Sequence, residues 1–263
     1  FMQQGICVLS VVPVRAEPSD TSEIVSQLLF GDLFRLTETR NSWVKICMTY
    51  DNYEGWIDIK QCCLLTEEEF NNLLHENKMV TADVISIIRD MTLGADYPIV
   101  SASSLPGLHN NNLNIGGHEY SFNGRYKDVS LKEDTRFNSD FAFTYLNAPY
   151  LWGGRSPLGI DCSGFTQVVM KMCGIVLPRD AAQQAMEGGP VDFVEEALPG
   201  DLAFFENTEN RIVHTGIILS GQKIIHASGR VRIDDIDHEG IFNKDLGAYS
   251  HKLRCIRRVF TSV

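Results

Sequence analysis

The chain has 263 residues, of which 44% are hydrophobic and 22% are charged, and its formal net charge is −11 at pH 7. This length suits two or three modules, and the composition is that of an ordinary globular protein. The acidic balance argues against nucleic acid as a partner. No apolar run approaches the roughly eighteen residues that a membrane span needs, so we expect no membrane span.

Cysteine usage also limits the chemistry. The seven cysteines are an odd number, with no CxxC pair and no zinc-finger spacing. We therefore expect no metal site and no dense disulfide framework. One free functional thiol fits the odd count, and so do seven buried thiols. The chain begins Phe1-Met2-Gln3 without a signal segment, so we expect a trimmed start, for which a removed leader is one explanation.

Residues 5 to 64 alternate short β-like runs with turn residues. Gly31-Asp32 marks one turn, and the runs SWVKICM and EGWID follow it. Short strands with frequent turns predict a small barrel. The order of VPVRAEP, W-V-K-I and Y-E-G-W-I-D resembles the bacterial SH3-like domain of cell-wall enzymes, in which a Gly-Trp pair begins the penultimate strand. We therefore expect a first SH3-like barrel over residues 1–65.

A short helix is predicted next, because TEEEFNNLLHEN offers Thr66 as N-cap and Glu69 to complete a capping box. Residues 66–78 are therefore expected to form a helical linker. The β-like pattern then returns with the loop signals Asn110-Asn111-Asn112 and Gly116-Gly117. We expect a second, divergent SH3-like barrel over residues 79–133, as an imperfect repeat of the first.

Residues 134–263 have a different pattern. DTRFNSDFAFTYLN, at 134 to 147, spaces its aromatic residues as one helix face, and further helices are predicted at about 162 to 173 and 180 to 187. The strand-like runs DLAFFE, VHTGIILS, KIIHASG and LRCIRRV follow. Helices followed by an antiparallel sheet predict an α+β domain.

Cys162 stands where a glycine-rich loop leads into the helix at 162 to 173. Unpaired backbone N–H groups at a helix start carry partial positive charge, so we expect the pKa of this thiol to be lowered and its nucleophilicity raised. Taken alone, a cysteine is more often a small buried hydrophobic residue. A nucleophile also needs a base within hydrogen-bond reach.

Two histidines lie in neighbouring predicted strands, His214 in IVHTGIIL and His226 in KIIHASG. A single histidine in a strand is more often a core residue with a partner. Adjacent strands would let His226 hydrogen-bond one nitrogen of His214 and leave the other nitrogen for Cys162. Two such histidines and a cysteine at a helix start favour a Cys-His-His catalytic triad.

Six motifs occur in order along this region: PYLWGG, DCSG, LPRDAAQQ, LPGDLAFF, HTGI and IHASG. In this order and at these separations they resemble the NlpC-type cell-wall peptidases, which are papain-like cysteine enzymes. The match is strong over about residues 149 to 230. The fold class that the resemblance implies is α+β, with a papain-like cysteine peptidase domain over residues 134–263 preceded by two small all-β SH3-like barrels.

The resemblance also assigns catalytic roles. Cys162 corresponds to the nucleophile, His214 to the general base and His226 to the polar residue that orients the base. Tyr150 resembles the tyrosine whose hydroxyl helps to stabilise the oxyanion, and the backbone N–H of Cys162 would be a second donor. No metal or organic cofactor is implied.

Two SH3-like modules ahead of such a domain resemble the γ-D-glutamyl-L-diamino acid endopeptidases of this family. These enzymes cleave the γ-D-glutamyl-diamino acid bond of peptidoglycan stem peptides that carry a free N-terminal L-Ala. The resemblance implies that Asp161 and Ser163 contact the substrate amine, since a buried ammonium without a carboxylate is costly. The alternative role of Asp161 is to cap the helix.

In those enzymes the first barrel also contributes acidic and tyrosine residues to the amine pocket. Our candidates are Glu17, in VRAEP, and Tyr53, which precedes the Glu-Gly-Trp run, with Glu23 and Tyr50 as substitutes. Trp152 is expected to be a packing residue.

Several alternatives stay open on the sequence. Arg179 is expected either to shape the cleft or to form a salt bridge at a helix start, which is a weak surface pair. An amidase or acyltransferase on the same scaffold and a non-catalytic peptidoglycan-binding protein are the rival functions. The sequence leaves open the diamino acid (diaminopimelate or lysine), the oligomeric state, and whether the protein acts in the cell envelope or recycles imported peptides in the cytoplasm.

Overall fold

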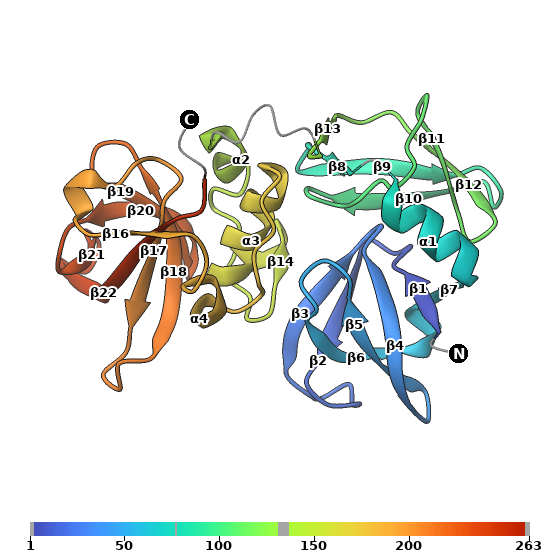
Figure 1. The fold of residues 1–263 in the computed structure, drawn as a ribbon, viewed down its shortest axis with the longest axis horizontal. Coiled ribbons are helices and arrows are strands. Elements are labelled where there is room, and N and C mark those ends of the chain that lie inside the picture. Colours follow the sequence, from blue (N-terminus) through green and yellow to red (C-terminus); the bar gives the residue numbers. More distant parts are fainter. Residues whose placement is uncertain (1–2, 77, 131–136, 261–263) are drawn as a thin grey trace. The chain divides into compact units, whose positions relative to one another are not determined.

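The computed structural model describes residues 3–76, 78–130 and 137–260 (Figure 1). The chain divides into two compact units. The first comprises residues 1–131 together with the short segment Trp152–Pro157, and the second comprises the rest of residues 132–263. The predicted boundary at residue 133 lies outside the described residues.

The first unit begins with a seven-stranded antiparallel sheet in the order β3-β2-β6-β5-β4-β1-β7. Alternate residues of β5 are buried, as the sequence pattern requires of a strand with one face on a core. That core includes Val12, Phe34 and Ile46. The strands are β1 (Gln4–Ile6), β2 (Val11–Arg15), β3 (Ile24–Leu29), β4 (Leu33–Arg40), β5 (Trp43–Met48), β6 (Glu54–Asp58) and β7 (Cys63–Leu65), with the 3-10 turn η1 (Ile59–Gln61) between the last two.

Helix α1 (Glu67–His75) follows, and the predicted capping box forms. The hydroxyl of Thr66 accepts a hydrogen bond from the backbone N–H of Glu69, whose carboxylate accepts one from the backbone N–H of Thr66. Phe70 on this helix is fully buried in a core that the two β modules share. The helix therefore packs as part of the first unit.

The rest of this unit is a second all-β module. It forms a four-stranded sheet in the order β10-β9-β12-β11 and a two-stranded pair, β13 with β8. Its core joins that of the first sheet through Phe30 and Leu33. Gly31, at φ +80°, lies so close to the second module that a Cβ would come 2.0 Å from the carbonyl oxygen of Ser104. The strands are β8 (Met79–Thr81), β9 (Ile85–Asp90), β10 (Ala95–Val100), β11 (Asn112–Ile115), β12 (His118–Phe122) and β13 (Tyr126–Asp128).

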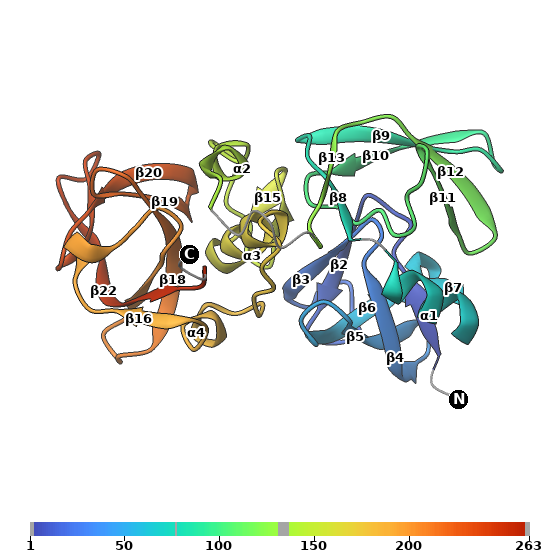
Figure 2. The same ribbon diagram turned by 45° about the horizontal axis from the view of Figure 1, so that its top comes forward.

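The second unit is α+β. Its sheet runs β16-β22-β17-β18-β19-β20-β21, and a further pairing of β21 with β22 closes strands β17 to β22 into a barrel (Figure 2). Helix α3 packs on β18 and β19. The strands are β15 (Gly159–Ile160), β16 (Gly189–Val191), β17 (Leu202–Glu206), β18 (Ile212–Leu219), β19 (Lys223–Ser228), β20 (Arg230–Ile236), β21 (Gly240–Asn243) and β22 (Ala248–Arg258); β14 (Arg155–Ser156) belongs to the first unit.

The helices of this unit are α2 (Ser139–Phe143), α3 (Cys162–Met172) and α4 (Ala181–Gln184), with a 3-10 turn η3 (Val194–Glu196). The prediction for α3 is confirmed. The other two helices are shorter than expected, because α2 ends at Phe143 and α4 ends at Gln184. The start of the predicted helix at 134 to 136 lies outside the described residues. None of the helices in the described part of the chain has both the length and the apolar character needed to cross a membrane.

Candidate active site

Cys162 is the first residue of α3, and Asp161 is the N-cap. The Asp161 side chain accepts a hydrogen bond of 2.7 Å from the backbone N–H of Gly164, which satisfies one of the unpaired donors of the helix start. The capping role that the sequence offered for Asp161 is therefore present. Cys162 is 6% exposed.

The expectation of a lowered thiol pKa is wrong. The pKa of Cys162 is raised to about 11, chiefly by burial and then by the negative charge of Asp161. Hydrogen bonds from the backbone N–H groups of Thr215 and Ser163 and the charge of Arg179 act in the opposite direction, but they do not outweigh burial. Desolvation disfavours the charged form of any group, and here it exceeds the effect of the helix start. At neutral pH Cys162 is a thiol.

The hydrogen bond to Cys162 from the backbone of Thr215 places the thiol against β18. His214 is the preceding residue on that strand. The helix start and the first predicted base therefore meet where α3 packs on the sheet.

The two predicted histidines form the expected hydrogen bond. Nε2 of His214 lies 2.8 Å from Nδ1 of His226, and both side chains are buried. The strands β18 and β19 pair with Gly216 opposite His226, so the two rings lie diagonally on neighbouring strands. Nδ1 of His214 takes no part in this bond and is the nitrogen left for another partner.

Asp234 is a member of this chain of side chains that the sequence analysis missed. Its Oδ2 lies 3.0 Å from Nε2 of His226, and its Oδ1 accepts a hydrogen bond of 2.9 Å from Nη2 of Arg232. Asp234 is 4% exposed. The signal in the sequence was an acidic residue in β20, the strand that follows the His226 strand, but strand pairing was needed to bring the two side chains together.

The carboxylate of Asp234 fixes the tautomers of both histidines. Burial raises the pKa of Asp234, but the hydrogen bonds from His226 and Arg232 outweigh this effect and lower it, so the group is ionised and can only accept. Nε2 of His226 must therefore carry the proton, Nδ1 of His226 must accept from Nε2 of His214, and Nδ1 of His214 keeps a lone pair. This arrangement leaves Nδ1 of His214 able to accept a proton.

Both histidines are neutral at pH 7. Burial lowers the pKa of His214 well below 6.5, and the neighbouring His226 and His251 lower it further. Burial also lowers the pKa of His226, although Asp234 opposes the shift. The resting site therefore pairs a neutral thiol with a neutral imidazole, and a proton would move only as a new bond forms at sulfur.

Tyr150 lies in the same electrostatic environment. Burial raises the pKa of its hydroxyl to about 12, followed in size by the effects of Cys162 and Asp161. The hydroxyl is therefore protonated at neutral pH and can donate a hydrogen bond. The backbone N–H of Tyr150 donates to the carbonyl of Gly229, which fixes its position beside β20.

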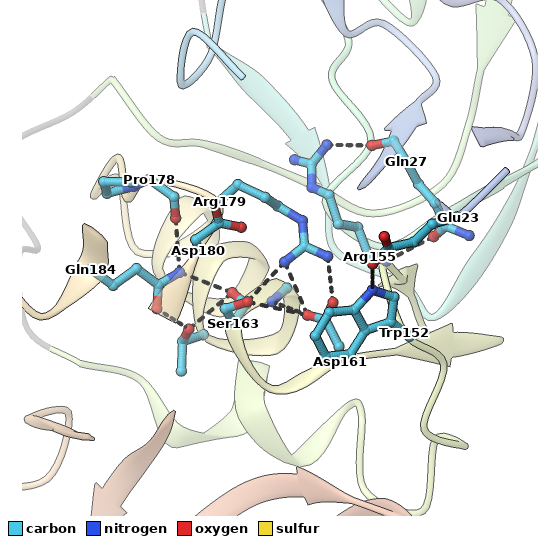
Figure 3. Close-up of polar contacts among 12 residues, drawn as sticks. Glu23, Gln27, Trp152, Arg155, Asp161, Ser163, Pro178, Arg179, Asp180 and Gln184 are labelled. Carbon is cyan, nitrogen blue, oxygen red and sulfur yellow. Dashed lines mark hydrogen bonds and ion pairs between the residues drawn. The ribbon is translucent and has the colours of Figure 1, made fainter. Parts of the chain in front are cut away.

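Asp161, Ser163 and Arg179 form a buried cluster (Figure 3). Arg179 donates from Nη1 to Asp161 Oδ1 at 3.0 Å, from Nη2 to Asp161 Oδ2 at 2.6 Å, and from Nη1 to Ser163 Oγ at 2.9 Å. Arg179 is 2% exposed. The expected weak surface pair is thus wrong, because the guanidinium binds the carboxylate in a bidentate, buried geometry.

The candidates from the first barrel lie in the first unit. Glu17 is exposed and its backbone N–H donates to Ser22, while Tyr53 packs against the barrel core. The substitute Glu23 accepts a hydrogen bond from the indole N–H of Trp152 (Figure 3). The expectation that Trp152 is a packing residue is wrong, since this side chain is 60% exposed and its polar edge binds Glu23.

Arg155 fixes the Trp152–Pro157 segment within the first unit. Its Nη1 donates to the carbonyl of Gln27 at 2.6 Å and to Asp32 Oδ2 at 3.1 Å, and its backbone N–H donates to the side chain of Gln27 at 2.7 Å. The Tyr50 ring lies 5.9 Å from the guanidinium carbon. The Trp152–Pro157 segment is therefore held by the side chain and carbonyl of Gln27 and by the carboxylate of Asp32.

Comparison with known proteins identifies the family. The family model described as the NlpC/P60 family matches residues 147–249, and the one described as the bacterial dipeptidyl-peptidase SH3 domain matches residues 14–61. A gamma-D-glutamyl-L-lysine dipeptidyl-peptidase of Bacillus subtilis is 42% identical over 221 residues, which are 78% of this chain and 72% of that protein. The chain belongs to the NlpC/P60 family.

Other relatives extend the similarity over more than nine tenths of the chain. Dipeptidyl-peptidase 6 of Lysinibacillus sphaericus is 24% identical over 270 residues, covering 92% of this chain and 95% of that protein. A crystal structure of an NlpC/P60 family protein from Bacillus cereus matches with a TM-score of 0.81 at 20% identity, covering 98% of this chain and 100% of that one. The latter likeness supports the fold.

Membership of the NlpC/P60 family makes this chain a cysteine peptidase, a hydrolase of a bacterial cell-wall family. The predicted fold class, a papain-like domain after SH3-like modules, is confirmed.

Proposed function

We propose that this NlpC/P60 peptidase hydrolyses the γ-D-glutamyl-diamino acid bond of peptidoglycan stem peptides with a free N-terminal L-Ala. The observation that supports a working peptidase is the chain of buried groups Asp234, His226 and His214, which ends at the strand against which Cys162 lies. The substrate class is supported by the relatives in Bacillus subtilis and Bacillus cereus, which are named gamma-D-glutamyl-L-lysine dipeptidyl-peptidases.

In the proposed mechanism Cys162 attacks the γ-glutamyl carbonyl as its thiol proton passes to Nδ1 of His214. The imidazolium that forms is stabilised by the hydrogen bond to His226, which Asp234 orients. The oxyanion accepts hydrogen bonds from the hydroxyl of Tyr150 and the backbone N–H of Cys162, and one such donor contributes roughly 3 kcal/mol. His214 then protonates the leaving amine, and water hydrolyses the thioester.

Recognition of the substrate amine is assigned to Asp161, Ser163 and acidic or tyrosine residues of the first barrel. Asp161 is already paired with Arg179, so its negative charge is largely compensated. A bound ammonium therefore needs a further carboxylate, for which Glu17 and Glu23 are the candidates, with Tyr53 and Tyr50 as hydroxyl donors.

The test is mass spectrometry of the products from L-Ala-γ-D-Glu-diaminopimelate, its lysine counterpart and the N-acetylated form of each. We expect cleavage only after γ-D-Glu, only with the free amine, and none by the Cys162→Ala variant. Rapid cleavage of the acetylated peptides would instead identify an amidase or acyltransferase. Sedimentation with insoluble peptidoglycan and no hydrolysis of any peptide would identify a wall-binding protein. The ratio of the two free-amine rates determines the diamino acid.

The cell envelope is the proposed compartment, because the family acts on cell-wall material. Recycling of murein peptides in the cytoplasm is the second candidate. Detection of the native protein in periplasmic or secreted fractions rather than in the cytosol would decide between the two.

A further inference from the structure

His251 forms a cluster with the two histidines of the proposed triad, although nothing in the mechanism uses it. It lies on β22, and its ring stacks on that of His214 with centroids 4.0 Å apart and an interplanar angle of 23°. One ring nitrogen of each of His214, His226 and His251 lies within 4.8 Å of the other two. We call these three residues the histidine cluster.

In two of the three rings, the nitrogen that points away from the cluster makes a hydrogen bond that orients the ring. Nε2 of His226 bonds to Asp234, so Nδ1 faces the cluster, and Nδ1 of His251 lies 2.8 Å from Oγ of Ser250, which leaves Nε2 of His251. A histidine that binds a metal through one nitrogen ordinarily bonds to a carboxylate or another oxygen through the other. The Asp234–His226 pair has this carboxylate–histidine arrangement already.

The protonation of the three rings also bears on metal binding. Burial lowers the pKa of His251 to about 4 and lowers that of His214 and His226 as well. All three imidazoles are therefore neutral at pH 7. Metal binding at Nε2 of His214 requires the proton on that nitrogen to move to Nδ1 or to leave, because Nε2 donates to His226 in the resting arrangement. His251 is the partly exposed member of the cluster.

We propose that the histidine cluster binds a divalent transition-metal cation of the Zn²⁺ class, and that this binding inhibits the peptidase. Imidazole nitrogens are preferred ligands of Zn²⁺, and three of them with a water complete a tetrahedral site. In such a site neighbouring nitrogens are about 3.3 Å apart at Zn–N distances of about 2.0 Å. Nε2 of His214 and Nδ1 of His226 are 2.8 Å apart, so the two rings must move slightly apart before the ion fits between them.

Metal binding and the hydrogen bond between His214 and His226 exclude each other, because both use the same two nitrogens. An occupied cluster removes the bond that orients His214. The ion is thus an inhibitor and not a cofactor. The inhibition rests on the proposed catalytic roles of His214 and His226, whereas metal binding itself does not.

The binding test uses the full chain carrying Cys162→Ala, so that the thiol cannot be a ligand. Calorimetric titration with ZnCl₂ is expected to show one ion per chain. Adding His251→Gln should weaken this affinity at least about tenfold, the scale of losing a group that supports a metal site. The matched control is His238→Gln, a histidine of the same unit outside the cluster, which should leave the affinity unchanged.

Three outcomes overturn the proposal: no binding to the Cys162→Ala chain, equal binding with and without His251, or equal losses in the His251 and His238 variants. If His251→Gln does not fold, imidazole NMR signals of the Cys162→Ala chain with Co²⁺ replace it. Broadening of His214, His226 and His251 supports the site, and broadening of other histidines alone refutes it.

The activity test uses the cysteine-containing enzyme. ZnCl₂ should inhibit peptide hydrolysis, a chelator should restore it, and His251→Gln should need at least about tenfold more metal for half-inhibition. Hydrolysis that Zn²⁺ does not change while the ion is bound refutes the inhibition. If no stem peptide is hydrolysed at all, the proposed function fails, and the binding test still judges the metal site.

Discussion

Nε2 of His226 lies 3.0 Å from Oδ2 of Asp234, so the carboxylate decides which nitrogen of His226 carries the proton. Through the 2.8 Å bond to His214 the same carboxylate determines which nitrogen of His214 can act as a base. Asp234 thus governs the proposed general base from two hydrogen bonds away.

Replacing Asp234 with Asn is expected to lower kcat by about 10²- to 10⁴-fold with little change in KM, the scale of a wrong histidine tautomer. Nη2 of Arg232 donates to Oδ1 of residue 234, whereas Nε of Arg232 lies 2.7 Å from Oδ2 without a hydrogen bond. We therefore expect the amide oxygen at the Oδ1 position and the NH₂ group at the Oδ2 position, facing His226. The proton would then move to Nδ1 of both histidines. The control is Asp235→Asn, which changes a carboxylate paired with Lys223 and Lys244. Equal effects of the two variants on kcat would refute the proposal that Asp234 sets the tautomers of His226 and His214.

The pH dependence of Cys162 alkylation follows from its raised pKa. Because the thiolate is the reactive form, the rate with iodoacetamide in the presence of a chelator should rise about tenfold per pH unit from 7 to 10. It should level off only near pH 11, where the pKa of Cys162 lies. The measurement is mass spectrometry of the labelled Cys162 peptide. A plateau near pH 7 would mean that a thiolate–imidazolium pair already exists in the free enzyme.

Replacing Arg179 with Ala should destabilise the second unit by about 3–5 kcal/mol, because it leaves the buried carboxylate of Asp161 without its cation. The side chains of Arg179 and Asp161 are 1% and 9% exposed. Arg211→Ala is the control, since Arg211 pairs with Glu209 at the surface and the loss there should stay below about 1 kcal/mol. Urea unfolding followed by circular dichroism measures both. Similar losses would show that burial does not strengthen the Arg179 pair.

Gly153→Ala should destabilise the first unit by about 2–5 kcal/mol. Gly153 has φ +77°, and an added Cβ would come 2.2 Å from the carbonyl oxygen of Ile24. Gly94 has φ +68° with nothing near its Cβ position, so Gly94→Ala isolates the left-handed backbone cost of about 1–2 kcal/mol. The remaining difference measures the close approach, for which overpacking costs about 1–3 kcal/mol. Equal decreases in melting temperature for the two variants would show that the segment at 152–157 moves to accept the Cβ without a loss of stability.

Local signals in the sequence predicted several features of the structure. The capping box at Thr66, the helix that begins at Cys162 and the paired strands around His214 and His226 all depend on residues close together in the chain. Periodicity and capping act over one or two turns or strands, so they can be read without the fold. The family motifs added the order of these elements and the chemistry that they support.

Other features needed the tertiary structure. Arg179 lies 18 residues from Asp161, and whether the pair is a weak surface contact or a buried bidentate one depends on what covers it. Asp234 and His251 reach the site only because β20 and β22 close the barrel. Each of these features belongs to groups that are distant in sequence and are brought together by strand pairing.

The sequence by itself determined the family, the order of the modules and the cysteine and histidines proposed for catalysis, because these are written in local motifs. Only the tertiary structure decided the protonation of those groups. The helix start at Cys162 predicted a lowered pKa, but burial depends on the whole surrounding domain and raises it to about 11. Desolvation is a property of everything packed around an atom, and no short stretch of sequence contains it.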